Sequence, residues 1–327
     1  MNKTQTKTKH YFLINPIAGN GEKQKKLDSL IAAATCKTGL ECSVYYTKGA
    51  GDTTRYIKEV CEKNREDSLR FYVCGGDGTF HEGINGTTPY PNAICGIVPV
   101  GTGNDFVKNF TNTGNFLDME AQLKGRAMSV DALRYNGGFC GNMINIGFDC
   151  AVASKIGDIK RNPVIPNKLA YGMGVLETLV RMPGVSAEIT IDGEPVKDAD
   201  YLLCTVANGS YCGGGYYSNP HASVEDGIID AVFIGRVSRM KFINLVGMYK
   251  KGTYLLHKDA KSFITYIKCK SIRFDFGKPT DICVDGEIEK LEYLEVRTLP
   301  KAVGIICPEG CELKNKYPQR ETVPVMA

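Results

Sequence analysis

Gly75-Gly-Asp-Gly-Thr79 is the stretch of sequence that decides the fold. It follows Leu69-Arg-Phe-Tyr-Val-Cys74, an apolar run with the length and composition of a β-strand. The residues after it, Phe80–Asn85, can open a helix. The glycines are therefore expected at a strand-to-helix turn, where backbone N–H groups are free and the helix dipole favours an anion. Such a turn lets a phosphate approach the main chain, although a tight turn that only needs small residues would have the same sequence.

Strand-like and helix-like segments alternate on both sides of this loop. Strands are predicted at His10–Ile14, Ser43–Thr47, Leu69–Cys74 and Ala93–Val98, and helices at Glu22–Thr35, at Asp52–Glu66 with Asp52 as N-cap, and from Asn104 to Phe110. This alternation predicts a doubly wound α/β domain with a parallel sheet. In such sheets the ligand lies beyond the carboxyl ends of the strands.

Two more glycine-rich segments follow predicted strands. They are Asn15-Pro16-x-x-Gly19-x-Gly21 and Pro99-Val-Gly101-Thr102-Gly103-Asn104-Asp105-Phe106. Pro16 fixes φ, the glycines open the backbone, and Thr102 offers a hydroxyl to a phosphate, whereas Asn104 or Asp105 could serve only as a helix cap. Neither segment has the third glycine of a dinucleotide fingerprint, and the sequence contains no Walker A ending. A nucleotide would therefore be held by several separate turns.

From Met128 onward the sequence changes to short strands around turns. Ser129–Tyr135 and Phe139–Ile146 predict a hairpin around Asn136-Gly137-Gly138. Helices are predicted at Lys168–Arg181 and Ser238–Lys250, and strands at Ala187–Ile191, Asp200–Ala207, Gly227–Ile234, Ser271–Phe276, Asp281–Val284, Leu291–Arg297 and Val303–Cys307. The last strand could belong to either domain. The sequence thus predicts an α/β domain over 1–127, joined by 302–327, and a mostly antiparallel β-sandwich-like domain over 128–301.

The composition excludes several classes of protein. The net charge of +4 does not indicate nucleic-acid binding. Most of the 13 cysteines lie in apolar runs and no Cys-x-x-Cys pair occurs, which indicates reduced thiols and no zinc site. The N-terminus lacks a signal-peptide pattern and no apolar run reaches membrane-spanning length. We therefore expect a cytoplasmic protein whose membrane contact, if any, is peripheral.

The three glycine-rich loops together resemble the diacylglycerol kinase catalytic domain. That family belongs to a superfamily with sphingosine and ceramide kinases and, more distantly, NAD kinases and phosphofructokinases. The resemblance covers nearly the whole chain, and Thr47 matches a family position that contacts the nucleotide. The nucleotide-binding residues implied by the resemblance are Asn15, Pro16, Gly19, Thr47, Gly75, Gly76, Asp77, Gly78, Thr79, Gly101, Thr102, Asn104 and Asp105.

The second domain continues the resemblance. Asn145-Ile-Gly-Phe-Asp149 is similar to a block that opens the family's β-rich domain. Gly213–Gly227 is similar to a segment that ends in a structural Mg²⁺ site in bacterial soluble members. The resemblance implies that the Asp226 carboxylate and the carbonyls of Ser223 and Ile228 would bind this ion. The alternative is a plain Asp-Gly turn between strands.

Asp-Gly-Glu occurs twice, at 192–194 and at 285–287, and each copy also reads as a plain hairpin turn. The residues alone do not choose between them. The resemblance favours the second, which makes Glu287 the general base on a lipid hydroxyl and Asp285 a metal or water ligand. Asp77 would be the third catalytic residue, bound to metal or ribose.

The resemblance implies an ATP-dependent lipid kinase that uses Mg²⁺ and most directly converts diacylglycerol to phosphatidic acid in the cleft between the domains. Two alternatives stay open: a kinase for another lipid alcohol (sphingoid base, ceramide-like or other glycerolipid) or for NAD, and a non-catalytic nucleotide- or lipid-sensing module. Tyr171–Leu176 and Leu202–Cys204 could line an acyl cavity or be core. The expected partners are a lipid substrate at the inner membrane face and, as an open alternative, a second copy in a homodimer, but no nucleic acid.

Overall fold

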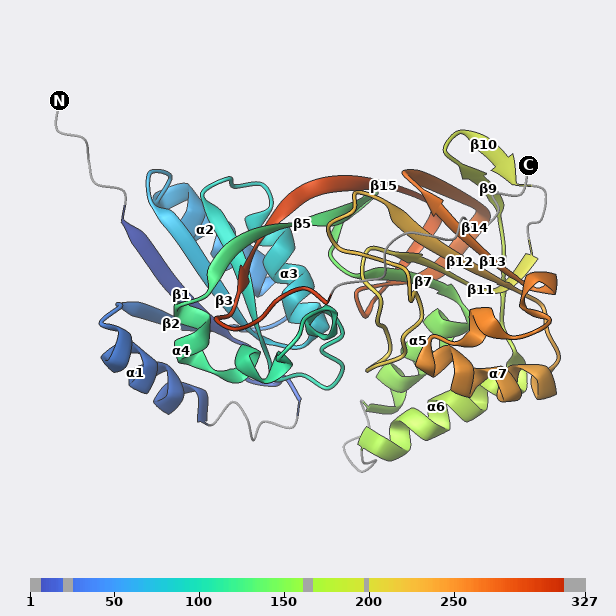
Figure 1. Cartoon of the computed structure of the whole chain (residues 1–327), viewed down its shortest axis with the longest axis horizontal. Coiled ribbons are helices and arrows are strands. Elements are labelled where there is room, and N and C mark those ends of the chain that lie inside the picture. The colour runs from blue at the N-terminus through green and yellow to red at the C-terminus, as the bar shows by residue number, and fades with distance from the viewer. Residues whose placement is uncertain (1–6, 20–25, 161–166, 197–199, 315–327) are drawn as a thin grey trace. The chain divides into compact units, whose positions relative to one another are not determined.

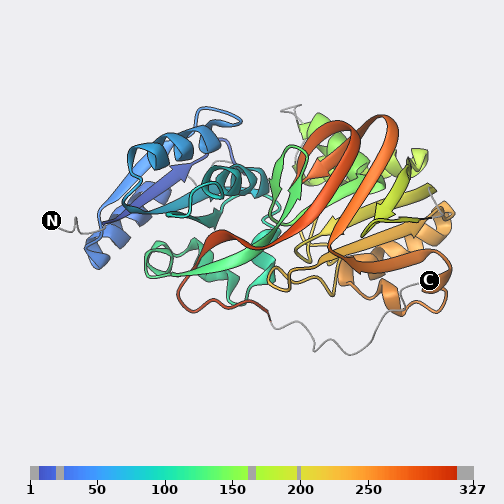
Figure 2. The same cartoon turned by 90° about the horizontal axis from the view of Figure 1, so that it is seen from above.

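The computed structural model describes residues 7–19, 26–160, 167–196 and 200–314, without the side chains of 160 and 167–172. The chain folds as two compact units (Figure 1). The first unit contains the chain up to Ala132 and also the segment that begins at Pro300. The second unit contains Leu133–Leu299. Two strands that pair with each other, β5 (Arg126–Tyr135) and β15 (Glu287–Cys307), run from one unit into the other (Figure 2).

The first unit contains a parallel sheet. Its strands are ordered β2 (Cys42–Tyr46), β1 (Thr8–Ile14), β3 (Ser68–Gly75) and β4 (Ala93–Pro99), and Ile305 of β15 pairs in parallel with Cys95 of β4. The strand Val303–Cys307 thus ends in the first unit. The helices are α1 (Leu27–Thr38), α2 (Asp52–Lys63), α3 (Asp77–Thr87) and α4 (Met119–Leu123).

Helices cover both faces of this sheet because its strands are apolar on both sides. Phe12 and Tyr72 pack with α1 and α4 in one core cluster. Val73, the next residue along β3, points to the other face of the sheet. Helix α3 lies close against that face: a Cβ added to Gly83 would be 2.7 Å from the sulfur of Cys95 and 3.0 Å from the side chain of Val73. The doubly wound α/β prediction is confirmed.

Two predicted details of the first unit are wrong. Asp52 is the first residue of α2 and not its N-cap: the preceding Gly51 is left-handed, and the carboxylate of Glu82 on α3 accepts the N–H groups of Gly51 and Thr53 instead. The predicted helix from Asn104 is only a 3-10 turn, Phe106–Asn109. The predicted helix start at Glu22, and Gly21 before it, lie outside the described residues.

The second unit is mostly antiparallel, as predicted. Its main sheet has the order β13 (Ile264–Cys269), β12 (Ile229–Gly235), β11 (Asp200–Ala207), β7 (Met143–Gly147), β14 (Ser271–Val284) and β15, and the other strands are β6 (Gly138–Cys140), β8 (Val185–Ser186), β9 (Glu188–Ile191) and β10 (Glu194–Val196).

A single long strand, β14, takes the place of two predicted ones. Its second half pairs with β7 and its first half pairs with β9. The register against β15 shifts between Asp275 and Thr280, where Gly277 has a φ of 63°. Such a bulge bends the strand, so β14 contributes to two layers that enclose one apolar core, with Ile146, Phe233 and Phe274 among its members.

Three helices gather on one side of the second unit's sheet: α5 (Phe148–Lys160), α6 (Asn167–Arg181) and α7 (Arg239–Lys251) (Figure 1). The sequence reading missed α5 and β13. Leu202 and Leu203 are buried in the core beneath these helices and Cys204 in the core between the layers. That stretch is therefore core, while Met173 and Leu176 of α6 are exposed.

Candidate functional site

The three glycine-rich segments follow β1, β3 and β4, and hydrogen bonds tie them together. The N–H groups of Val100 and Gly101 both donate to the carbonyl of Gly75, at 3.0 and 3.1 Å. The side-chain amide of Asn15 donates to the hydroxyl of Thr79 at 3.1 Å. The structure therefore brings the three predicted loops into one cluster at the carboxyl ends of the strands.

Two glycines of the cluster are required by close backbone approach. A Cβ on Gly101 would lie 2.3 Å from the Cα of Gly76. A Cβ on Gly19, where φ is 63°, would lie 2.5 Å from the carbonyl oxygen of Val100. Any larger residue would force the loops apart, so the glycines set the spacing of the cluster.

Helix α3 begins at Asp77, directly inside the Gly75–Thr79 loop. Its N-cap is Gly76, which has no side chain that could cap this end. The first turn of a helix has N–H groups without intrahelical acceptors, and the helix dipole is positive there. The cluster therefore surrounds a helix terminus of the kind that binds phosphate.

Two carboxylates meet beside this terminus. The N–H of Asp105 donates to Oδ1 of Asp77 at 2.6 Å, and the ammonium of Lys108 contacts Oδ1 of Asp105 at 2.5 Å. Burial raises the pKa of Asp77 well above its ordinary 3.8, and the nearby charge of Asp105 raises it further, while this N–H and Lys108 oppose the shift. Carboxylate oxygens are the donors that Mg²⁺ prefers, so the pair fits that ion.

The remaining predicted nucleotide residues occupy different positions around the cluster. Thr47 is buried at the end of β2, and both its N–H and its hydroxyl donate to the carbonyl of Ile14, at 2.9 and 3.4 Å. Pro16 and Thr102 are exposed, and Gly78 lies in the first turn of α3. The side-chain amide of Asn104 donates to the carbonyl of Gly101 and supports a φ of 52°, so Asn104 holds the third loop in shape.

In the second unit, the two Asp-Gly-Glu segments form hairpin turns of the same kind. Asp192 and Gly193 have φ values of 48° and 91°, and Asp285 and Gly286 have 48° and 97°. Two positive φ values in succession define the tight turn that joins antiparallel strands.

The glutamates that follow the turns are also equivalent in position. Glu194 pairs with Ile191 and Glu287 pairs with Val284, each as the first residue of a strand. Both glutamates are exposed.

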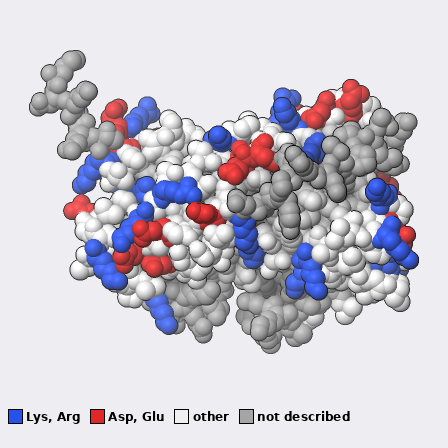
Figure 3. Space-filling model, viewed as in Figure 1, with Lys and Arg blue, Asp and Glu red and all other residues white. Residues whose placement is uncertain are grey.

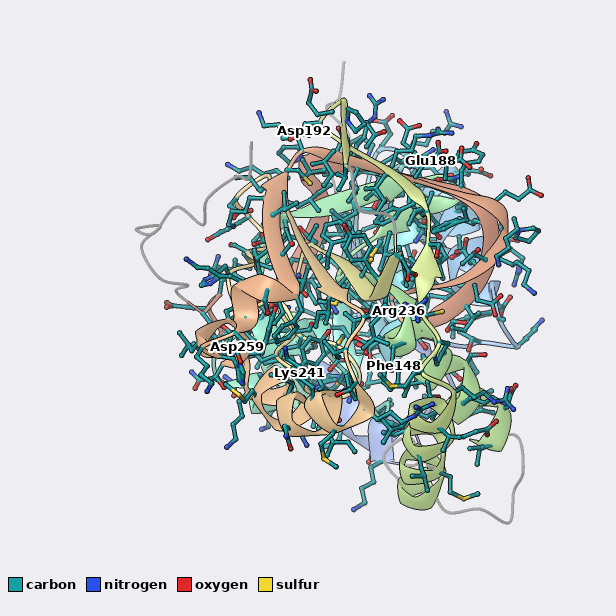
Figure 4. The ribbon with its side chains drawn as sticks, turned by 90° about the vertical axis from the view of Figure 1, so that its right-hand side faces the viewer. Phe148, Glu188, Asp192, Arg236, Lys241 and Asp259 are labelled. Atoms are coloured by element: carbon teal, nitrogen blue, oxygen red, sulfur yellow. The ribbon has the colours of Figure 1, made fainter. Side chains whose placement is uncertain are left out.

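The two aspartates differ in burial. Asp192, at the turn labelled in Figure 4, is exposed and accepts the N–H groups of Lys270 and Ser271. Asp285 is only 7% exposed, and its carboxylate accepts N–H groups from three consecutive residues at 2.8 to 3.0 Å, namely Gly141, Asn142 and Met143. A thiol, that of Cys140, donates to the same carboxylate at 3.1 Å.

This anchoring explains why the predicted strand Phe139–Ile146 is two strands. The N–H groups of 141–143 point toward Asp285, and Gly141 and Asn142 lie between β6 and β7 outside both strands. Asp285 therefore acts as a main-chain anchor in this structure. Its role as a metal or water ligand stays a prediction.

The predicted metal site at Asp226 stays a prediction, and the Asp226 carboxylate has other partners in this structure. Oδ1 of Asp226 accepts the N–H of Ile228 at 3.2 Å, and the ammonium of Lys268 lies 3.5 Å from Oδ2. The described part of the chain holds no cluster of three or more His, Cys, Asp or Glu side chains that could bind a metal, but the predicted site, with one carboxylate and two carbonyls, is of a different kind. A divalent ion would have to share the Asp226 carboxylate with a lysine and rely on the carbonyls of Ser223 and Ile228.

Among the residues that the structure describes, no helix combines the length and the apolar character needed to span a bilayer.

Comparison with known proteins supports the same reading of both units. The family model of the diacylglycerol kinase catalytic domain matches residues 9–135. The model of the YegS C-terminal NAD kinase beta sandwich-like domain matches residues 142–307, which is about half of the chain.

Similar proteins match over most of their length. A "Putative lipid kinase" of Staphylococcus epidermidis (strain ATCC 12228 / FDA PCI 1200) is 28% identical over 291 residues, which cover 88% of this chain and 90% of that protein. A relative of the same description from Staphylococcus haemolyticus is 28% identical over 309 residues, with 93% and 95% covered. The crystal structure of "a putative diacylglycerol kinase" from Bacillus anthracis has a TM-score of 0.70 at 26% identity and covers 92% of this chain and 97% of that one. The glycine-rich loops of the first unit, the β-rich second unit and these matches together show that the chain belongs to the diacylglycerol kinase catalytic-domain family, with a C-terminal domain of the YegS type.

Proposed function

We propose that this protein is an ATP-dependent lipid kinase that phosphorylates the free hydroxyl of diacylglycerol to give phosphatidic acid. One observation carries the proposal: three separate glycine-rich loops form a single cluster around the N-terminus of α3, beside the carboxylates of Asp77 and Asp105. The names of the similar proteins support a lipid acceptor, and the description of the Bacillus anthracis structure supports diacylglycerol.

The first unit would bind the nucleotide. In the proposal, N–H groups of the Gly75–Thr79 loop and the first turn of α3 bind the phosphates, and the hydroxyl of Thr79, positioned by Asn15, donates to them. Asp77 and Asp105 would hold the Mg²⁺ that accompanies ATP, and that ion would neutralise phosphate charge. Because Asp77 already has a raised pKa, a cation at this place would also relieve the cost of ionising Asp77.

Glu287 of the second unit would be the general base. A lipid hydroxyl is a very weak acid, so a carboxylate must accept its proton while the new P–O bond forms. Glu287 is exposed and follows a two-residue turn whose aspartate is fastened by three main-chain hydrogen bonds. A base at the end of such an anchored turn keeps a constant position, which positioning catalysis requires.

The lipid lies in a bilayer, so the proposal includes peripheral contact with a membrane surface. Leu176 and Val180 of α6 are each 63% exposed and Met240 of α7 is 69% exposed. The two helices touch there, because the guanidinium of Arg239 donates to the carbonyls of Leu179 and Val180.

Basic residues accompany these apolar side chains on the same helices: Arg181, Arg239, Lys241, Lys250 and Lys251. Figure 4 labels Lys241 on α7. Figure 3 shows Lys and Arg interspersed with Asp and Glu on the face that it presents, so a single-sign field does not dominate there. Exposed apolar side chains next to lysines and arginines are typical of surfaces that lie on anionic lipid.

The proposal is tested by incubating the purified protein with labelled ATP, Mg²⁺ and single acceptors in mixed micelles, followed by separation of the products. The acceptors are diacylglycerol, monoacylglycerol, sphingosine, ceramide and, in buffer, NAD. We expect label on diacylglycerol above all others. Preferential label on another acceptor would replace diacylglycerol as the substrate, and nucleotide binding without label on any acceptor would favour a sensing module.

A further inference from the structure

A fully buried carboxylate lies in the sheet of the second unit. Asp230 on β12 is 0% exposed and stands opposite Lys268 of β13 in the strand register. The ammonium of Lys268 lies 3.0 Å from Oδ1 and 3.1 Å from Oδ2 of Asp230, and the hydroxyl of Tyr266 donates to Oδ1 at 2.7 Å. A buried carboxylate needs a partner of opposite charge, and Lys268 supplies it.

The same ammonium reaches the Asp226 turn. Its nitrogen lies 3.5 Å from Oδ2 of Asp226 and donates to the carbonyl of His221 at 3.3 Å. One positive charge is thus surrounded by oxygen atoms from two carboxylates and one carbonyl. Such a set of oxygen donors would also suit a hard metal ion.

We propose that Lys268 is the resident cation of this turn and that Asp226 does not hold a structural divalent metal ion. A divalent ion bound to Asp226 would stand close to the ammonium that contacts the same carboxylate, and like charges at such a distance repel each other. Unlike Lys108 beside Asp105, Lys268 also neutralises the fully buried carboxylate of Asp230, so it cannot leave the turn without leaving that charge unpaired. The other oxygen of Asp226 already accepts the N–H of Ile228. The ammonium, which belongs to the chain, joins the 221–226 segment to β12 and β13 without any ion from solution.

The proposal concerns the fold and not the reaction. It is independent of the Mg²⁺ that would accompany ATP at Asp77 and Asp105. The measurements are therefore made without nucleotide. A cation effect on the Tm that Asp226→Asn removes would indicate an ion at Asp226, whereas an effect that remains in this variant would indicate an ion elsewhere, such as at Asp77 and Asp105.

The first experiment compares the melting temperature of the parent and of Asp226→Asn in Mg²⁺, in Ca²⁺ and in chelator. We expect the two proteins to respond to the cations in the same way, because Asp226 binds none of them. A cation-induced rise in the Tm of the parent that Asp226→Asn removes would overturn the proposal, since linkage would then place an ion at Asp226.

The second experiment replaces the ammonium itself. Lys268→Met should lower the Tm by several degrees because Asp230 loses its partner, and Lys268→Arg should keep most of the parent's Tm because the charge remains. Lys270→Met, at an exposed lysine two residues further on, is the matched control and should leave the Tm unchanged. A Lys268→Met protein as stable as the parent would contradict the proposal. If Lys268→Met does not fold, the first experiment still decides.

Discussion

Glu287 and Glu194 follow hairpin turns with nearly identical φ values, and both carboxylates are exposed. Their local geometry is therefore matched, and only their surroundings differ. If Glu287 is the base, Glu287→Gln should lower kcat by about 10²–10⁴-fold. ATP affinity should survive, because the phosphate loops belong to the first unit. Steady-state kinetics and nucleotide titration measure both quantities.

Glu194→Gln is the control for this prediction. It changes the same side chain at the same position of an equivalent turn, so its kcat should stay close to that of the parent. The reverse result, with Glu194→Gln inactive and Glu287→Gln normal, would move the base to the other hairpin and leave the kinase proposal in place.

The raised pKa of Asp77 predicts that its substitution changes the stability of the protein as well as its activity. Its pKa is raised in the folded protein, so the folded state binds more protons than the unfolded state above pH 3.8. Stability is then lost as the pH rises from that value toward neutrality. Asp77→Asn removes this loss while its side-chain oxygen can still accept the N–H of Asp105.

We therefore expect Asp77→Asn to melt above the parent at neutral pH and to be inactive as a kinase. The difference in Tm should shrink as the pH is lowered toward 3.8, and thermal melts of both proteins across this range measure it. A variant that melts below the parent at neutral pH, or that turns over at the parent's rate, would contradict the assignment.

The loops that follow β3 and β4 in the first unit meet at a glycine contact, where no side chain separates the two backbones. Gly101→Ala would place a methyl group 2.3 Å from the Cα of Gly76, so the loops after β3 and β4 must separate. We expect ATP affinity to fall by about tenfold or more, which corresponds to about 1.4 kcal/mol, because the phosphate-binding N–H groups move. Calorimetric titration of ATP measures this change.

Gly114→Ala provides a matched control in the same unit. A Cβ on Gly114 would have no atom within 4 Å, and its φ is not in the left-handed region. ATP affinity of this variant should equal that of the parent. Equal affinities for Gly101→Ala and the parent would show that the close approach of the loops does not shape the nucleotide site.

For the molecule as a whole, the prediction concerns membrane binding. Flotation with vesicles should show more bound protein as anionic lipid increases and less as salt increases, because basic side chains accompany the exposed apolar ones on α6 and α7. Met240→Gln should weaken this binding. Leu30→Gln, at a 46% exposed leucine of α1, should not. Equal binding to neutral and anionic vesicles at both salt concentrations would contradict the prediction.

The sequence by itself determined the α/β first unit, the β-rich second unit and the places of the three glycine-rich loops. These features depend on local patterns: apolar runs of strand length, glycines directly after them, and Asp-Gly pairs that favour positive φ. Each pattern is complete within about ten residues, so it can be read without knowing what packs against it.

Only the tertiary structure decided what the polar side chains of those elements bind. Asp285 divides the strand predicted at Phe139–Ile146, although 143 residues separate it from Asn142, and Glu82 takes the capping role expected of Asp52. Lys268 meets Asp226 only because β13 pairs with β12. The physical reason is the same in each case: a buried carboxylate or N–H group must find a partner, and the partner is set by which distant segments the fold brings together.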